Sequence, residues 1–202
     1  MSHQKKLISV EQQKMIIKYL EGTRSSLRNK VIFLLSLNGM RVSEMSALDW
    51  EHLTFKEGHF TARIERPRVN GDESFKQSMF FSKSLTKCLI ELKDSTNIKS
   101  GAVICSERGG ARMSAQSIAN WFKRAYKDVG LDGLSSHSGR RTFITQAAME
   151  ITKAGGSLRD IQAHVGHTSL QTTKHYLQHN DEAQKQVVDM VDNLHLSDKK
   201  EK

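Results

Sequence analysis

Two segments dominate the last third of the chain: SSHSGRRTFIT at residues 135–145 and HVGHTSLQTTKHY at residues 164–176. Between Ser135 and Tyr176 the only carboxylates are Glu150 and Asp160. Arginines, histidines and a phenol in a region with so few carboxylates suit an anion, and a phosphodiester is the obvious candidate. The groups concerned are His137, Arg140, Arg141, His164, His167, His175 and Tyr176.

These residue types indicate phosphoryl-transfer chemistry. Arginine forks bind non-bridging phosphate oxygens bidentately and stay charged at any working pH. A histidine titrates near neutrality and can take or give a proton, and a tyrosine hydroxyl can act as the nucleophile of a covalent intermediate. Such a scheme requires no Mg²⁺, so the chain is expected to use no cofactor and no metal.

Length and charge bound the class of protein. The chain has 202 residues, enough for one good-sized domain, and its 31 lysines and arginines against 22 aspartates and glutamates give a net charge of +9. That charge suits a polyanionic partner, with salt-sensitive affinity. Cys88 and Cys105 have no metal-like spacing, and no signal-peptide pattern or membrane-length apolar run is visible. A cytoplasmic, nucleoid-associated protein with no membrane partner is expected.

Apolar periodicity and capping residues predict a mainly helical α+β fold. Ser9 followed by Gln12 resembles a capping box, and Asn38-Gly39 is typical of a helix end. Alternating residues around the turn dipeptide Asn70-Gly71 predict a small antiparallel β-hairpin from residue 59 to residue 81. Helices are predicted at residues 10–20, 27–37, 82–92, 114–129, 137–149 and 157–165, with a short one opening at residue 43 and others after residues 168 and 180.

A second informative stretch, NGMRVSEM at residues 38–45, places Arg41 in the turn between two helices. A surface cation is the commoner fate of an arginine. The functional interpretation is that the turn holds Arg41 rigidly and that Glu44 buttresses it. In HSGR, His137 and Arg140 are three residues apart, so they are expected to share one helical face.

Three motifs in this order resemble the catalytic domain of the tyrosine recombinases, the phage integrase family: NGMRVSEM, HSGR and GHTSLQTTKHY. The family pattern is an arginine inside G-x-R-x-S-E, a later H-x-x-R, and G-H followed nine residues on by the nucleophilic tyrosine. The resemblance runs from about residue 9 to about residue 195. The matching residues are Arg41, His137, Arg140, Gly166, His167 and Tyr176.

The resemblance implies both a fold and a function. The fold is that of a tyrosine recombinase catalytic domain, and the function is site-specific cleavage and rejoining of DNA. Tyr176 would attack the scissile phosphate and form a 3′-phosphotyrosine, without metal or ATP. Arg41, Arg140 and His167 would hold the phosphoryl oxygens, and His137 would be the general base.

The hairpin departs from the family pattern, which has a catalytic lysine there that protonates the leaving 5′ oxygen. Near the usual position stand Arg66 and Arg68 around Pro67, and arginine is a poor proton donor because its pKa exceeds about 12. The only lysine of the hairpin is Lys76, on the return strand. Lys76 is therefore the nominee for general acid, and a solvated strand residue is the competing interpretation.

Other interpretations compete with a recombinase. The histidine pairs at 164 and 167 and at 175 and 179 have spacings compatible with zinc, but no cysteine is near and zinc would leave Arg41 and Arg140 unused. His164 and His175 are therefore interpreted as structural or DNA-proximal. A topoisomerase-like enzyme that nicks and closes DNA is one functional alternative. A recombinase-derived DNA-binding regulator is another, and the missing lysine at the usual position keeps it open.

The expected organisation is a catalytic domain over residues 1–180 and a C-terminal helix and tail over residues 181–202. In related recombinases a C-terminal helix docks on a neighbouring protomer, and the same exchange is expected here. The expected partner is double-stranded DNA at a specific site, bound by a homo-oligomer that is a dimer or tetramer. Lys123, Arg124 and Lys127 are favoured as phosphate contacts over a solvated helix face. Only about eight residues precede the first predicted helix, so a short form without the N-terminal core-binding domain is expected.

Overall fold

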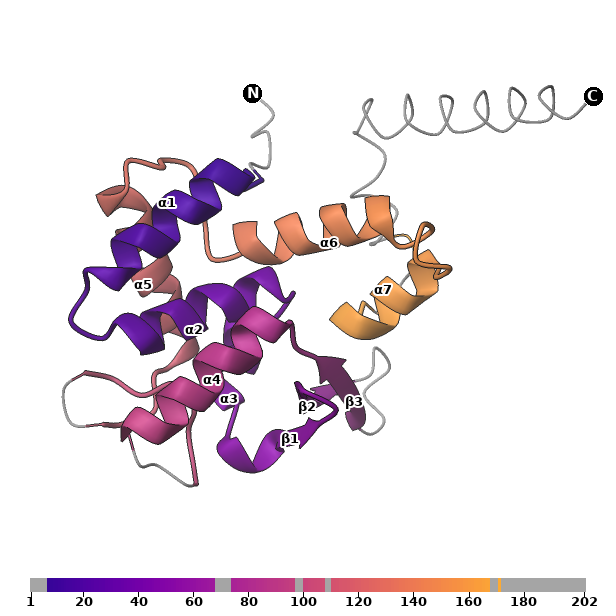
Figure 1. The fold of residues 1–202 in the computed structure, drawn as a ribbon, viewed down its shortest axis with the longest axis horizontal. Helices are drawn as coiled ribbons and strands as arrows, with labels where there is room; N and C mark the ends of the chain where they lie inside the picture. The colour runs from indigo at the N-terminus through magenta and orange to yellow at the C-terminus, as the bar shows by residue number, and fades with distance from the viewer. Residues whose placement is uncertain (1–6, 68–73, 97–99, 108–109, 168–170, 172–202) are drawn as a thin grey trace, which may run out of the picture.

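The computed structural model describes residues 7–67, 74–96, 100–107, 110–167 and 171. Within them the chain forms helices, one 3₁₀ turn (η1) and strands (Figure 1). In chain order these are α1 Val10–Glu21, α2 Ser26–Leu37, α3 Val42–Ala47, η1 Trp50–His52, β1 Leu53–Lys56, β2 His59–Pro67, β3 Ser74–Phe80, α4 Lys83–Thr96, α5 Ala115–Asp128, α6 Ser138–Glu150 and α7 Leu158–Val165. The predicted α+β, mainly helical class is confirmed.

The helices begin and end close to the predicted positions. At the start of α1, the Gln12 amide donates to Ser9 Oγ at 3.2 Å and the Ser9 amide donates to Gln12 Oε1 at 3.0 Å, which confirms the capping box. α2 ends at Asn38, and Gly39 has a φ of 89°, which only glycine adopts readily. A Cβ on Gly39 would also lie 2.9 Å from the Phe143 ring, so this turn requires glycine.

The strands form an antiparallel sheet in the order β1-β2-β3. The β2–β3 pair confirms the predicted hairpin, and its register sets Thr61 opposite Phe80 and Glu65 opposite Lys76. Strand β1 is a finding that the sequence did not predict. It joins β2 through the two-residue turn Glu57-Gly58, where φ is 50° and 80°. Positive φ at both central positions is the geometry of a type I′ hairpin turn.

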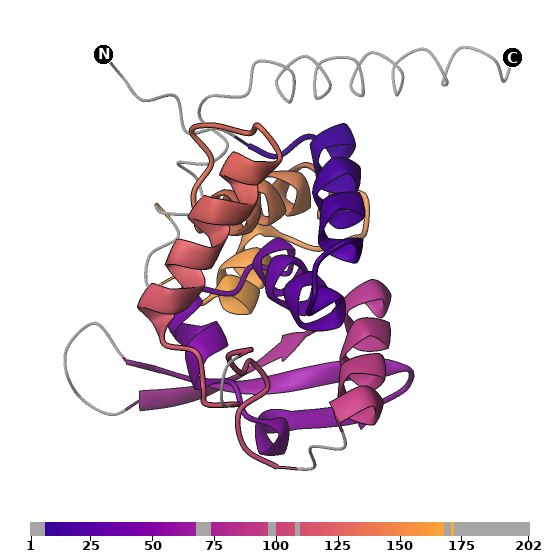
Figure 2. The ribbon, with the colours of Figure 1, turned by 90° about the vertical axis from the view of Figure 1, so that its left-hand side faces the viewer.

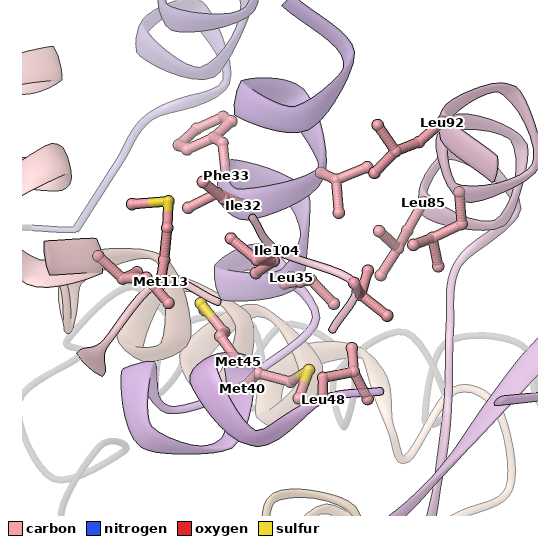
Figure 3. Packing of buried hydrophobic residues seen from close by; sticks show 14 of the residues in the cluster. Ile32, Phe33, Leu35, Met40, Met45, Leu48, Leu85, Leu92, Ile104 and Met113 are labelled. Carbon is pink, nitrogen blue, oxygen red and sulfur yellow. The ribbon is translucent and has the colours of Figure 1, made fainter. Parts of the chain in front are cut away.

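α2 is the central helix of the main core. Its residues Ile32, Phe33 and Leu35 are fully buried and pack between α4 and the α3 region (Figure 3). Their partners labelled in Figure 3 are Met40, Met45, Leu48, Leu85, Leu92, Ile104 and Met113. The sheet lies along one side of the molecule, and the helices lie above it (Figure 2).

α6 crosses α2 at close range and carries α7 with it. A Cβ on Gly139 of α6 would lie 2.8 Å from the Cβ of Ser36 and 3.1 Å from its carbonyl carbon, so glycine permits this approach. A second apolar cluster joins α6 to α7, and α7 also lies against β3. The buried members of that cluster are Ile144, Ala148, Ile161 and Val165. Among the described residues, no helix is both long and apolar enough to cross a membrane.

Candidate active site

Arg41 stands at the N-terminal cap of α3, in the turn that follows α2. Its backbone amide donates to Glu44 Oε2 at 2.7 Å, and its Nη1 donates to Glu44 Oε1 at 2.7 Å. The side chain of Glu44 is only 8% exposed, whereas that of Arg41 is 34% exposed. The buttressing contact predicted from the sequence is present, and it leaves the Arg41 guanidinium partly open to solvent.

Arg140 approaches the same carboxylate from α6. Its side chain is 6% exposed, and its Nη1 lies 4.0 Å from Glu44 Oε2. Nη1 also donates to the carbonyl of Gly39, and Nη2 donates to the carbonyl of Val165 at 2.7 Å. The Glu44 carboxylate therefore lies between two guanidiniums and offsets their mutual repulsion. The sequence did not predict this shared carboxylate.

Both arginines bind the C-terminal end of α7. Arg41 Nη1 lies 3.4 Å from the Val165 oxygen, and its Nη2 lies 3.2 Å from the Gly166 oxygen. Carbonyls at a helix C-terminus carry partial negative charge, which favours nearby cations. These contacts of Arg41 span 124 and 125 residues of sequence, so the cluster of charges exists only in the folded chain.

His167 directly follows this helix end and is half-buried. α7 stops at Gly166, whose φ of 61° lies in the left-handed region. The His167 amide then donates to the Gln162 carbonyl at 3.1 Å, and Gln162 Nε2 donates to the His167 carbonyl at 3.0 Å. Gln162 thus binds both the backbone amide and the backbone carbonyl of His167. Sequence reasoning missed Gln162, for which the glycine-terminated helix end was the available signal.

His137 is the N-cap residue of α6 and is exposed, three residues before Arg140. Its pKa is lowered from the ordinary value of 6.5, first by partial desolvation and then by the positive charges of Arg141, Arg140 and Arg41. A lowered pKa keeps the imidazole neutral near pH 7, which is the state that a general base requires.

His164 is engaged in contacts within the protein. Its Nε2 lies 3.3 Å from the Asn38 carbonyl oxygen, and its ring packs on Phe143 with 5.1 Å between centroids. These contacts support the structural interpretation of His164 over zinc ligation. Among the described residues, no group of three histidines, cysteines, aspartates or glutamates is placed to hold a metal ion.

Two predicted catalytic residues are placed only in part or not at all. Lys76 lies in β3 opposite Glu65, in a strand that contacts α7. Tyr176 lies outside the described residues, as do His175 and the predicted C-terminal segment 181–202. The structure therefore brings together the motifs that contain Arg41, His137, Arg140 and His167, and it brings the strand that contains Lys76 close to α7.

Fold and motifs together define a class of protein. The sequence model of the phage integrase family matches residues 6–183. The chain belongs to the phage integrase family, and its fold is that of a tyrosine recombinase catalytic domain.

Individual relatives agree with this assignment. The chain is 31% identical to tyrosine recombinase XerC of Corynebacterium glutamicum and 33% identical to that of Corynebacterium efficiens, each over 149 residues, 72% of this chain and 44% of the relative. It therefore spans somewhat under half the length of these curated relatives. The crystal structure of XerA recombinase matches with a TM-score of 0.70 at 23% identity, over 92% of this chain and 64% of that chain. XerH recombinase bound to palindromic difH substrate matches with a TM-score of 0.71 at 16% identity, over 93% and 54%.

Proposed function

We propose that the chain is the catalytic domain of a site-specific DNA recombinase that cleaves and rejoins DNA through Tyr176. The observation that carries the proposal is the convergence of Arg41 and Arg140 on Glu44 and the end of α7. Two guanidiniums held at one point suit the non-bridging oxygens of a scissile phosphate. The names of the XerC relatives support the choice of reaction, and a structural neighbour in complex with DNA, the Tn1549 transposon integrase, supports the choice of substrate.

The proposed reaction exchanges one phosphodiester for another. Tyr176 Oη attacks the scissile phosphorus and forms a P–O bond, while the bond to the 5′ oxygen breaks. His137 accepts the tyrosine proton, and Lys76 supplies the proton that the leaving 5′ oxygen takes up. The two arginines and His167 stabilise the charge that grows on the non-bridging oxygens. Attack by the 5′ hydroxyl of another strand reverses these steps, and the retained phosphodiester energy makes ATP unnecessary.

The direct test is strand exchange between two copies of a site on one plasmid, with sites drawn from DNA that flanks the gene. Deletion or inversion products without added metal or ATP are the expected result. Relaxation of a supercoiled plasmid that lacks the site would instead indicate a topoisomerase-like enzyme. Binding of the site without cleavage would indicate a DNA-binding regulator.

The cleavage rate should follow the protonation state of His137. Because the pKa of His137 is lowered, the acid limb of the pH–rate profile should have its midpoint below 6.5. Replacing Arg141 with glutamine removes a nearby cation, which favours the imidazolium form, so the limb should move to higher pH. Single-turnover cleavage across the limb measures this. Arg159→Gln, at an exposed position on α7, is the control. Identical limbs in wild type and Arg141→Gln would contradict this role for His137.

We propose that α5 contacts the DNA backbone. Lys123, Arg124 and Lys127 are exposed, whereas Trp121 and Phe122 on the opposite side of the helix are buried in the core. These exposed side chains give the helix a cationic face toward solvent. Such a face supplies phosphate contacts and salt-dependent affinity.

Removal of the α5 charges should change the salt dependence of binding. Each phosphate contact contributes about −0.9 to the slope of log K against log salt concentration. The double variant Lys123→Ala/Lys127→Ala should therefore have a slope whose magnitude is smaller by about 2. The matched control is Lys83→Ala/Lys87→Ala, which removes two exposed lysines from α4, on the opposite side of the molecule in Figure 2. Equal slopes for the two double variants, measured by fluorescence anisotropy, would remove α5 from the interface.

We also propose that residues 181–202 form a segment exchanged between protomers of a dimer or tetramer on DNA. The sequence DEAQKQVVDMVDNL within it has an apolar stripe at helical spacing. A chain ending at residue 180 should cleave a suicide duplex but form fewer multi-protomer complexes in a gel shift. Unchanged complex formation by that shortened chain would argue against exchange.

A further inference from the structure

We infer that Asn38 is a positioning residue that holds three parts of the active site in register: the turn before Arg41, the base of the β2–β3 hairpin, and the end of α7. Its side chain and its carbonyl connect to separate elements. The inference deepens the proposed function and rests on it for its catalytic readout.

The Asn38 amide group is buried and uses both of its ends. The residue is 6% exposed and caps α2. Its Nδ2 donates to the Leu34 carbonyl at 2.8 Å and to Ser82 Oγ at 3.3 Å, while its Oδ1 accepts from the Ser82 amide at 2.8 Å. Closing α2 needs only the bond to Leu34, so the two contacts with Ser82 go beyond a capping role.

Ser82 stands at the junction between β3 and α4. Its Oγ accepts from the Leu85 amide at 3.3 Å and so caps α4. The preceding residue, Phe81, donates its amide to the Phe60 carbonyl at 2.9 Å, and its own carbonyl lies 3.0 Å from His59 Nδ1. Because β2 and β3 are joined at this corner, fixing Ser82 to Asn38 fixes the base of the hairpin that contains Lys76 against the end of α2.

The backbone carbonyl of Asn38 connects to α7. This carbonyl oxygen lies 3.3 Å from Nε2 of His164. His164 precedes His167 by three residues. Arg41 and Arg140 bind the next carbonyls of α7, those of Val165 and Gly166. Arg41 in the turn at residues 38–41 thus binds the end of α7, and His164 of α7 binds the turn. Through Ser82, the Asn38 side chain connects the base of the β2–β3 hairpin to the same turn.

The chain contains a matched control at the other end of the same helix. Asn29 is 4% exposed in α2, its Nδ2 donates to Thr23 Oγ1 at 2.9 Å, and its Oδ1 accepts from Arg28 Nη2 at 2.6 Å. It has the same side chain, similar burial and similar bonding, but these bonds join it to Thr23 and Arg28 and not to the segments that contain Arg41, Lys76 or His167. A purely structural role predicts the same consequences for loss of either asparagine.

The test compares Asn38→Ala with Asn29→Ala in single-turnover cleavage and DNA affinity, at a temperature where both variants are folded. Both should lower the midpoint of thermal unfolding. Only Asn38→Ala should slow cleavage, by about 10- to 100-fold, because small misplacements of reacting groups have effects of this size. Its DNA affinity should stay within about twofold, because the phosphate-binding cations remain. Wild-type cleavage by Asn38→Ala, or equal losses in both variants, would overturn the inference.

A second readout does not depend on catalysis. The Ser82 amide donates to Asn38 Oδ1, so its hydrogen exchange should lose protection in Asn38→Ala and keep it in Asn29→Ala. Retained protection of Ser82 in Asn38→Ala would contradict the inference. If the wild-type chain does not cleave DNA, the proposed function fails, but the exchange experiment still decides whether Asn38 holds the hairpin base.

Discussion

Replacing Arg140 with alanine should abolish most DNA cleavage while the protein still binds DNA. Loss of a single preorganised donor that faces a developing charge costs about 10²- to 10³-fold in rate. The Arg140 side chain is also only 6% exposed, and it shares the Glu44 carboxylate with Arg41. Its loss removes the 2.7 Å bond to the Val165 carbonyl and leaves Glu44 with one cation instead of two, so the free energy of unfolding should fall by about 1 to 3 kcal/mol. Single-turnover cleavage and chemical denaturation measure the two effects separately.

Arg28 provides the control for this prediction. Its side chain is 12% exposed and pairs with Glu107 at 2.7 Å, and its Nη1 also donates to the Cys105 carbonyl at 3.2 Å. It lies in the first turn of α2, at the opposite end from the Arg41 turn. Arg28→Ala should therefore lower stability but leave cleavage unchanged at a temperature where the variant is folded. Similar cleavage losses in both arginine variants would mean that Arg140 acts only through folding.

Replacing Gly139 with alanine should destabilise the fold strongly, although it adds only one methyl group. The new Cβ would meet Ser36 Oγ and Cβ and would lie 3.1 Å from the Ser36 carbonyl carbon. Backbone atoms of α2 cannot move aside without shifting the core, so the cost should be about 2 to 3 kcal/mol, the upper part of the usual overpacking range. Chemical denaturation measures it. Gly22→Ala, where the nearest atom lies 3.5 Å away at the Tyr19 carbonyl, should change stability little.

A double-variant cycle identifies the clash. Ser36→Gly removes the side-chain atoms that the new Cβ would meet, at a cost of about 1 kcal/mol for a glycine inside α2. The pair Gly139→Ala/Ser36→Gly should therefore be more stable than Gly139→Ala alone. Additive losses would show that the α6–α2 approach is not the cause.

Local signals in the sequence predicted the fold elements well. Ser9 and Gln12 form the capping box that their spacing predicts, and Asn38-Gly39 ends α2 with the left-handed glycine that such a pair indicates. The β2–β3 hairpin follows the alternation of its residues. Strand β1 was not predicted because it has only four residues and because its turn, Glu57-Gly58, lacks the usual asparagine or aspartate.

The arrangement of the site could be predicted only in part. The contact of Arg41 with Glu44 is local, three residues apart, and was predictable. The contacts with the carbonyls of Val165 and Gly166 were not, because a backbone carbonyl gives no sequence signal and the bonds span more than a hundred residues.

Helical spacing did not predict how differently His137 and Arg140 are exposed. His137 is the exposed cap of α6, whereas the Arg140 side chain is buried. The helix begins one residue later than predicted, so the i, i+3 relation joins a cap to a helical residue.

Covalent trapping tests the proposed nucleophile most directly. The protein is mixed with nicked suicide duplexes from the DNA around its gene, in EDTA, and products are separated on a denaturing gel. The expected result is a protein band shifted by attached DNA in wild type and no such band in Tyr176→Phe, with equal non-covalent binding. A shifted band that persists in Tyr176→Phe would exclude Tyr176 as the nucleophile. Wild-type protein that binds the duplex tightly and forms no band would contradict the proposed recombinase.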